Sequence, residues 1–279
     1  MQRPAKKGGG RLAKLLPRWE WAGKTGGGAL HRGVEADEYR KMAAVEDGMW
    51  FYRALHGHIR RELTAGLGRG PASILDAGCG TGGLIRRLGP AEPAWRWTGV
   101  ELEPLACALA RERVGADTQI HEASVTALPF ADATFDAVVL SDVIYHLDDD
   151  MAALREAHRV LRPGGILVVN APAHPWLWSY HDVATHARRR YGRGELKGKL
   201  LAAGFGAGAM RLTHWNTLLL PLVAVRRKLL PAPAGGSDVA AYSPLLEWLG
   251  RAAMALERVW LNYVGRLPFG VSLFATAKK

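Results

Sequence analysis

The sequence predicts an α/β fold built on a doubly wound, mostly parallel sheet. Two observations carry this prediction. Short apolar and β-branched segments alternate with helical segments between residues 73 and 203, at the rhythm of βαβ units. The first of these strands also runs into a glycine-rich turn at residues 76–82 (DAGCGTG). A strand that ends in such a turn just before a helix is typical of the mouth of an open α/β sheet, where nucleotides bind.

The apolar segments define seven expected strands, at about 73–77, 97–102, 118–122, 135–141, 166–170, 207–215 and 271–277. Helices are expected at about 82–89, 104–113, 125–127, 149–161 and 194–203. A helical pattern from Glu35 to Leu67 is interrupted by an aromatic cluster at 45–52, after which a second helix runs from Tyr52 toward Leu63. Proline and glycine at 162–165 (RPGG) end the helix before the fifth strand.

Composition bounds the class of protein. The chain has 279 residues, of which 48% are hydrophobic and 23% charged, which is ordinary for a soluble globular domain with an elaboration. A net charge of +11 favours contact with polyanions or with an anionic membrane surface. The two cysteines, Cys79 and Cys107, are too few for a disulfide framework and indicate a reducing, cytoplasmic compartment. The basic N-terminus continues into glycines rather than an apolar segment, so no signal peptide is expected.

Four segments organise the chain. Residues 1–31 are basic and glycine-rich, and are expected to form a flexible tail or a short basic anchor on lipid. Residues 32–69 form N-terminal helices that would cover the mouth of the sheet as a lid, and the aromatic cluster at 50–52 belongs either to this lid or to the core. Residues 70–216 and 267–279 form the α/β core, and residues 217–266 form an apolar helical insertion before the last strand.

The insertion has one apolar helical face, because its large side chains recur at spacings of three and four. The members of this face are Leu245, Leu249, Ala252, Leu256, Val259, Trp260 and Tyr263. Packing onto the core is the simpler interpretation. The alternative is a cap over a lipophilic substrate that also rests on a membrane. The preceding apolar run at 217–230 is too short to span a bilayer.

The glycine turn admits two kinds of ligand at this point. Gly78, Gly80 and Gly83 have the G-x-G-x-x-G spacing of dinucleotide sites, which by itself is a weak signal. Asp76 lies immediately before the glycines, however, and a carboxylate there would repel a pyrophosphate. The acid favours a ligand that carries a cationic or amine group, as S-adenosylmethionine does.

Four segments in sequence order then resemble a known family. They are residues 74–82 (ILDAGCGTG), 98–102 (TGVEL), 128–136 (LPFADATFD) and 161–165 (LRPGG). Over about 70–170 the chain resembles a class I S-adenosylmethionine-dependent methyltransferase of the small-molecule type, similar to the quinone and lipid methylases. This resemblance implies a Rossmann-like, seven-stranded sheet whose last strand is antiparallel.

The resemblance also implies which residues contact the cofactor. Asp76 would hold the ammonium group of the methionine moiety. The backbone at Gly78, Cys79, Gly80 and Gly82 would pass under the methionine and ribose, and Glu101 would accept both ribose hydroxyls. Leu102 would lie on the adenine. The family often has an acid where this chain has Ser124, followed by Val125, so a serine hydroxyl replaces that contact with the adenine amino group. Ser141 closes the fourth strand, where the reactive methyl would lie.

Candidate catalytic residues follow from position and chemistry. His146 comes just after the fourth strand and is the first candidate for a general base, although a histidine that caps the next helix is an equally natural interpretation. His181 with Asp182 is the second candidate, in a loop expected to fold over the acceptor. His181 and His186 are five residues apart and would not share a helix face, so no metal site is expected.

The sequence therefore predicts O-methylation of a lipophilic small molecule by in-line methyl transfer, with an anionic membrane surface as a candidate partner. C- or N-methylation of a small molecule and methylation of RNA are the alternatives. The basic residues are spread over the chain without an added RNA-binding module, which makes nucleic acid an unfavoured partner. The sequence gives no indication of an oligomeric state.

Overall fold

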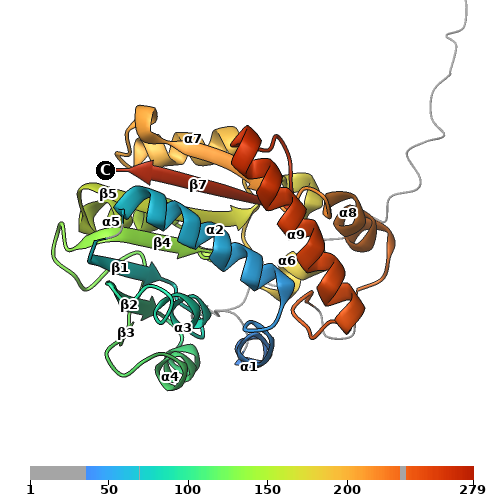
Figure 1. Cartoon of the computed structure of the whole chain (residues 1–279), viewed down its shortest axis with the longest axis horizontal. Coiled ribbons are helices and arrows are strands. Elements are labelled where there is room, and N and C mark those ends of the chain that lie inside the picture. The colour runs from blue at the N-terminus through green and yellow to red at the C-terminus, as the bar shows by residue number, and fades with distance from the viewer. Residues whose placement is uncertain (1–35, 69, 233–236) are drawn as a thin grey trace, which may run out of the picture. The chain divides into compact units, whose positions relative to one another are not determined.

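The computed structural model describes residues 36–68, 70–232 and 237–279, so the predicted tail at 1–31 lies outside the described residues. The strands of the described chain form one seven-stranded sheet in the order β3-β2-β1-β4-β5-β7-β6 (Figure 1). Their bounds are β1 (Ala72–Ala77), β2 (Trp95–Glu101), β3 (Gln119–Glu122), β4 (Phe135–Ser141), β5 (Leu161–Pro172), β6 (Arg211–Trp215) and β7 (Ser272–Lys278). β1 to β5 are parallel, whereas β7 runs antiparallel to both β5 and β6. The predicted fold class, including the antiparallel last strand, is confirmed.

Helices cover both faces of this sheet. The described helices are α1 (Ala36–Val45), α2 (Trp50–Leu67), α3 (Gly83–Leu88), α4 (Pro104–Arg113), α5 (Asp150–Val160), α6 (Tyr180–Ala184), α7 (Arg193–Ala202), α8 (Leu220–Leu229) and α9 (Pro244–Val264). Three short 3-10 turns are η1 (Ile144–His146), η2 (Pro175–Leu177) and η3 (Ala207–Ala209). One buried cluster joins α5 and α7 to the sheet, and a second joins α2, α3, α4 and α9 to its other face.

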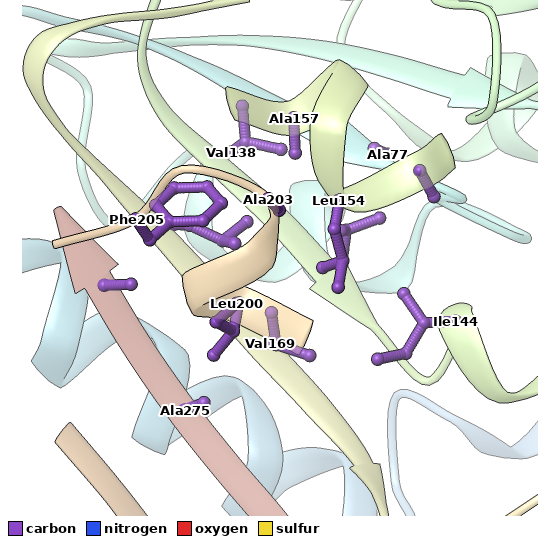
Figure 2. Close-up of a cluster of buried hydrophobic side chains, with 14 of the residues drawn as sticks. Ala77, Val138, Ile144, Leu154, Ala157, Val169, Leu200, Ala203, Phe205 and Ala275 are labelled. Carbon is purple, nitrogen blue, oxygen red and sulfur yellow. The ribbon is translucent and has the colours of Figure 1, made fainter. Parts of the chain in front are cut away.

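The cluster under α5 and α7 shows how the sheet is held (Figure 2). Leu154 and Ala157 of α5 recur at helical spacing and lie, with Leu200 of α7, over Val138 of β4 and Val169 of β5. All five side chains are at most 1% exposed, so the carboxyl ends of the central strands are set on a rigid base.

Three local expectations differ from the structure. The predicted helix at 125–127 is a turn, because the Ser124 hydroxyl accepts a hydrogen bond from the backbone N–H of Thr126 (3.2 Å) and competes with helical bonding. β5 already starts at Leu161, since the segment at 162–165 extends the strand instead of separating it from α5. The sixth strand begins at Arg211, after η3, rather than at 207.

The insertion folds as the two helices α8 and α9, but its apolar face does not pack onto the core. Leu256 is 66% exposed and Tyr263 is 87% exposed. The side of α9 that does face the protein consists instead of Gly250, Met254 and Leu261 together with the charged Glu257. Among the described helices, none is both long enough and apolar enough to cross a membrane.

Candidate active site

The glycine turn joins β1 to α3 and is fixed against β2. The backbone N–H groups of Gly78 and Cys79 both donate to the Val100 carbonyl, at 2.7 and 2.9 Å. Gly78, Gly80 and Gly82 have φ values of +83°, +52° and +80°, in the left-handed region that other residues rarely adopt. A Cβ on Gly78 would meet the side chain of Val143, which lies just after β4. The turn therefore lies against the end of β4.

Asp76 is a buried carboxylic acid without a partner. It is 2% exposed, and no hydrogen-bond donor among the described residues contacts its carboxylate. Burial, reinforced by the negative charges of Glu101 and Glu46, raises the pKa of Asp76 to about 8. A buried acid beside two others stabilises a cation that enters the site, since the cation removes the mutual repulsion.

Glu101 is held at the end of β2 by backbone donors. Its Oε2 accepts from the Gly80 N–H (3.0 Å), and its Oε1 accepts from Leu102 (2.9 Å) and Glu103 (3.1 Å). Burial raises the pKa of Glu101, and these hydrogen bonds oppose that rise. Oε2 has a single donor, so it can accept another from a ligand hydroxyl. Leu102, directly beside it, is 54% exposed and offers an apolar surface to a flat ligand.

The first helix and the loop after it lie over the glycine turn. The Tyr39 hydroxyl is 3.4 Å from Oε1 of Glu101, and a Cβ on Gly80 would meet the Met42 methyl. Glu46 accepts hydrogen bonds from the buried Thr81 hydroxyl and from Arg113 of α4. These contacts give the N-terminal segment a defined place at the mouth. The sequence carries no signal for these contacts, because Glu46 and Arg113 are 67 residues apart and neither belongs to a motif.

A chain of hydrogen bonds links β6 and β5 to Asp142, the residue that follows β4. Trp215 Nε1 donates to Asn170 Oδ1 (2.8 Å), and Asn170 Nδ2 donates to Asp142 Oδ1 (2.9 Å). Burial raises the pKa of Asp142 to about 7, against the opposing effect of the Asn170 hydrogen bond. Asp142 also has a φ of +57°, a conformation that costs about 1–3 kcal/mol and is common at functional sites. The one signal in the sequence was the position of Asp142 after Ser141, where β4 ends.

His146 ends η1, directly after this acidic position. Its ring lies 3.9 Å from that of Tyr145, between centroids. Burial lowers the pKa of His146 to about 4, and backbone groups of His186 and Thr185 oppose that shift. The imidazole is therefore neutral at pH 7. A neutral imidazole has one ring nitrogen without a proton, which is the property that a general base requires.

His181 and Asp182 lie on α6 and are engaged in structural contacts. Asp182 accepts from Arg190 through both oxygens, at 2.7 and 3.0 Å, in an ion pair whose side chains are only 1–2% exposed. Asp182 Oδ2 also accepts from the Ser179 N–H and closes the capping box of α6. His181 Nδ1 accepts from the Asp238 N–H (3.1 Å), and burial lowers the pKa of His181 to about 4. Both carboxylate oxygens of Asp182 and the Nδ1 atom of His181 thus already have structural partners.

The remaining predicted cofactor residues lie in or near the turn and at the end of β4. Cys79 is buried in the turn, Val125 is buried in the cluster beside α5, and Ser141 is half-buried and pairs with Asn170 in the sheet. The Ser124 hydroxyl is 2.8 Å from the Thr126 hydroxyl. Within the described residues, no group of three or more His, Cys, Asp or Glu side chains could hold a metal ion.

Residues 75–169 match the family model described as "Methyltransferase domain". The chain is 38% identical over 113 residues to the demethylmenaquinone methyltransferase of Thermus thermophilus. The aligned residues make up 39% of this chain and 51% of that protein. The chain carries a class I S-adenosylmethionine-dependent methyltransferase domain. The family expected from the four sequence segments is confirmed, and with it the cofactor.

Two further proteins resemble this methyltransferase domain. The malonyl-[acyl-carrier protein] O-methyltransferase of Pseudescherichia vulneris is 35% identical over 149 residues, which cover 48% of this chain and 57% of that protein. The structure of the Burkholderia thailandensis 1,6-didemethyltoxoflavin-N1-methyltransferase, which contains bound S-adenosylhomocysteine, matches with a TM-score of 0.54 at 21% identity over 88% of this chain and 87% of that one. The chain thus spans only about half the length of the curated relatives it matches, whereas the shared fold extends over most of it.

Proposed function

We propose that the protein is an enzyme that methylates a hydroxyl group of a lipophilic small molecule, with His146 as the general base. The observation that carries the proposal is that a buried acid and a neutral histidine lie at the same edge of the sheet. Asp76, a buried acid without a donor among the described residues, lies at the start of the glycine turn. His146, a neutral histidine, lies just past the end of β4, and Val143 in the same segment lies against Gly78 of the turn.

The donor side fits S-adenosylmethionine residue by residue. The carboxylate of Asp76 would bind the ammonium group, Oε2 of Glu101 would accept a ribose hydroxyl, and Leu102 would cover one face of the adenine. The hydroxyl of Ser124 would take the contact that an acid makes in other members, and Ser141 would border the methyl group. The cofactor supplies an electrophilic methyl group on a sulfonium.

The acceptor side supplies alignment and a base. Burial, and after it nearby negative charges that include Asp142, raise the pKa of the Tyr52 and Tyr145 phenols, so both aromatic side chains lie near that carboxylate. An acceptor hydroxyl held there would give its proton to His146, which is uncharged and therefore able to receive it. Base catalysis of this kind contributes about 10²–10⁴-fold to a rate.

The relatives support a small molecule and leave its chemistry open. One is named for demethylmenaquinone, which is lipophilic, and another for O-methylation of malonyl-[acyl-carrier protein]. The aromatic mouth favours the lipophilic class. We further infer that such an acceptor is taken up at an anionic membrane surface on the cytoplasmic side. The alternatives are C- or N-methylation of a small molecule and methylation of RNA, and a survey of substrates distinguishes them from O-methylation.

The test measures cofactor binding and methyl transfer separately. We expect S-adenosylmethionine to bind in titration calorimetry, and a panel of hydroxylated quinols, fatty acids and RNA to show transfer to a quinol or lipid hydroxyl. Transfer confined to RNA, or failure to bind the cofactor, would contradict the proposal.

A substitution at His146 tests its role as the base. His146→Asn should lower kcat by about 10²–10⁴-fold while cofactor affinity changes less than about twofold. His158→Asn, on α5 and away from the mouth, is the matched control. Because the pKa of His146 is about 4, the wild-type rate should stay flat from pH 7 down to about 5 and fall as the imidazole becomes protonated below that. An acid limb centred at pH 6.5 would instead assign the base to a different group.

A further inference from the structure

Exposed apolar side chains are concentrated on the insertion. Of the 20 large hydrophobic side chains that are exposed in the described residues, 14 lie between Leu218 and Val264. Single exposed apolar residues are normal, but a group of this size marks an interaction surface.

The exposed residues form a stripe along each helix. The outer stripe of α9, spaced by three, four or seven residues, comprises Leu245, Leu249, Leu256, Val259, Trp260 and Tyr263, which are 46–87% exposed. The stripe of α8 and its first turn comprises Leu218, Leu222, Val225 and Leu229, which are 47–75% exposed. Each helix therefore presents one continuous apolar face to its surroundings.

The charges around these stripes are cationic. Residues 217–266 contain six Lys or Arg and three acids. All three acids are engaged by partners within the protein: Asp238 pairs with Arg227 (2.7 Å), Glu247 accepts from the Trp50 N–H (2.9 Å), and Glu257 is buried among backbone donors. The cations that remain at the surface include Lys228, Arg258 and Arg266.

We infer that the stripes of α8 and α9 dock in the interfacial layer of an anionic lipid bilayer. An apolar stripe with Trp and Tyr, flanked by Lys and Arg, is the pattern of helices that lie in that layer. A second copy of this chain would bring the same cations face to face, whereas anionic headgroups neutralise them. This inference rests on the proposed function for its purpose, since a bilayer is where a lipophilic acceptor dissolves.

The inner side of α9 links this surface to the mouth. Glu247 holds the first residue of α2, and Arg251 donates to the Gly48 carbonyl (3.0 Å) in the loop between α1 and α2. The same loop contains Glu46, whose carboxylate bonds to Thr81 in the glycine turn. A bilayer bound to α9 would therefore hold the segment that covers the cofactor site, beside the Tyr52 ring that borders the acceptor.

The experiment is flotation of the full chain with vesicles, in the absence of cofactor and acceptor. Vesicles of phosphatidylcholine with phosphatidylglycerol should carry the wild-type protein upward, and vesicles of phosphatidylcholine alone should carry much less. Leu256→Glu should lower the vesicle partition coefficient about tenfold or more, because it removes a leucine that the bilayer would bury and adds a charge that anionic lipid repels.

Leu201→Glu is the matched control, since Leu201 is an exposed leucine of α7 outside both stripes (41% exposed). It should float as the wild type does. Both variants keep the basic tail at 1–31, so their difference isolates the stripe. Equal flotation of the two variants, or a wild type that does not float with anionic vesicles, would overturn the inference. So would a wild-type dimer that Leu256→Glu dissociates while flotation is unchanged, because a second copy would then cover the stripe.

These outcomes are independent of methyl transfer. A protein that floats but does not bind S-adenosylmethionine would contradict the proposed function alone. One that binds the cofactor and does not float would contradict the docking surface alone.

Discussion

At the scale of single residues, the site is defined by a buried carboxyl group that has no partner among the described residues. Asp76 lies at the end of a buried strand, next to two further carboxyl groups, and has no hydrogen-bond donor among the described residues. Such a group is costly to ionise, so it binds a proton until a cation replaces it. The free protein therefore holds a proton at the position where the cofactor's ammonium group is proposed to bind.

This arrangement predicts how Asp76→Asn changes stability. Between pH 3.8 and about 8 the folded protein keeps a proton on Asp76 that the unfolded chain has released. The carboxyl group therefore lowers the free energy of unfolding by about 1.4 kcal/mol for each pH unit over that window. The asparagine lacks this penalty, so the variant should gain stability over the wild type as pH rises from 4 to 8. Denaturant unfolding at several pH values measures this, and a constant difference would contradict it.

The same residue predicts a proton released on cofactor binding. Asp76 must ionise to hold an ammonium group, so wild-type affinity should increase from pH 6 to about 7.5 and level off as the free amino group, with an ordinary pKa of about 7.7–8.0, loses its own proton. Calorimetry in buffers of different ionisation enthalpy should detect the released proton in the wild type. Asp76→Asn should bind more weakly and release none. Release by the variant would assign the proton to another group.

At the scale of elements, the glycine turn holds β1, α3 and α4 together. Gly82 precedes α3 with φ +80°, and a Cβ there would meet Val114 at 2.9 Å and the backbone of Ala110 at 3.3 Å. Gly164, in β5, has the same φ of +80° with nothing within 4 Å. The two positions share their backbone conformation and differ in what surrounds them.

Alanine substitutions at these two glycines distinguish the cost of the left-handed backbone conformation from the cost of a crowded Cβ. Gly164→Ala should cost about 1–2 kcal/mol of unfolding free energy from the left-handed conformation alone. Gly82→Ala should cost this plus about 1–3 kcal/mol for the crowded Cβ, and should weaken cofactor binding as α3 is displaced. Thermal unfolding with and without S-adenosylmethionine compares them. Equal destabilisation would mean that α4 moves aside freely.

Sequence patterns predicted the elements better than the contacts between them. The strands and the glycine turn have local signals, so Asp76 and Glu101 could be located from the chain alone. The clamp of Glu46 on Thr81 and Arg113 has no such signal, because it depends on how α1 packs. The periodicity of α9 likewise showed that an apolar face exists but not whether it turns inward, since inward packing there uses Gly250 and a buried glutamate.

At the scale of the whole molecule, α9 connects the C-terminal part of the described chain to its N-terminal helices. Glu257 accepts from the backbone of Asn216 (2.5 Å) and Thr217 (2.6 Å), which fixes the start of the insertion. Nearer the start of α9, Gly250 lies against the indole ring of Trp50 in α2. This contact brings together segments 200 residues apart and lets α9 approach α2 closely (Figure 1).

The close approach predicts opposite effects of one substitution at two helical glycines. Glycine within a helix ordinarily costs about 0.5–1 kcal/mol relative to alanine, so Gly57→Ala in α2, where nothing lies within 4 Å, should stabilise the protein by that amount. At Gly250 the added Cβ would overlap the Trp50 ring, and overpacking of about 1–3 kcal/mol should outweigh the helical gain. Gly250→Ala should therefore unfold at lower denaturant concentration than the wild type, and Gly57→Ala at higher. Because α9 also holds the loop over the glycine turn, Gly250→Ala alone should reduce affinity for S-adenosylmethionine. If both variants were stabilised, α9 would not be seated on Trp50, and the link from the outer stripe to the mouth would fail with it.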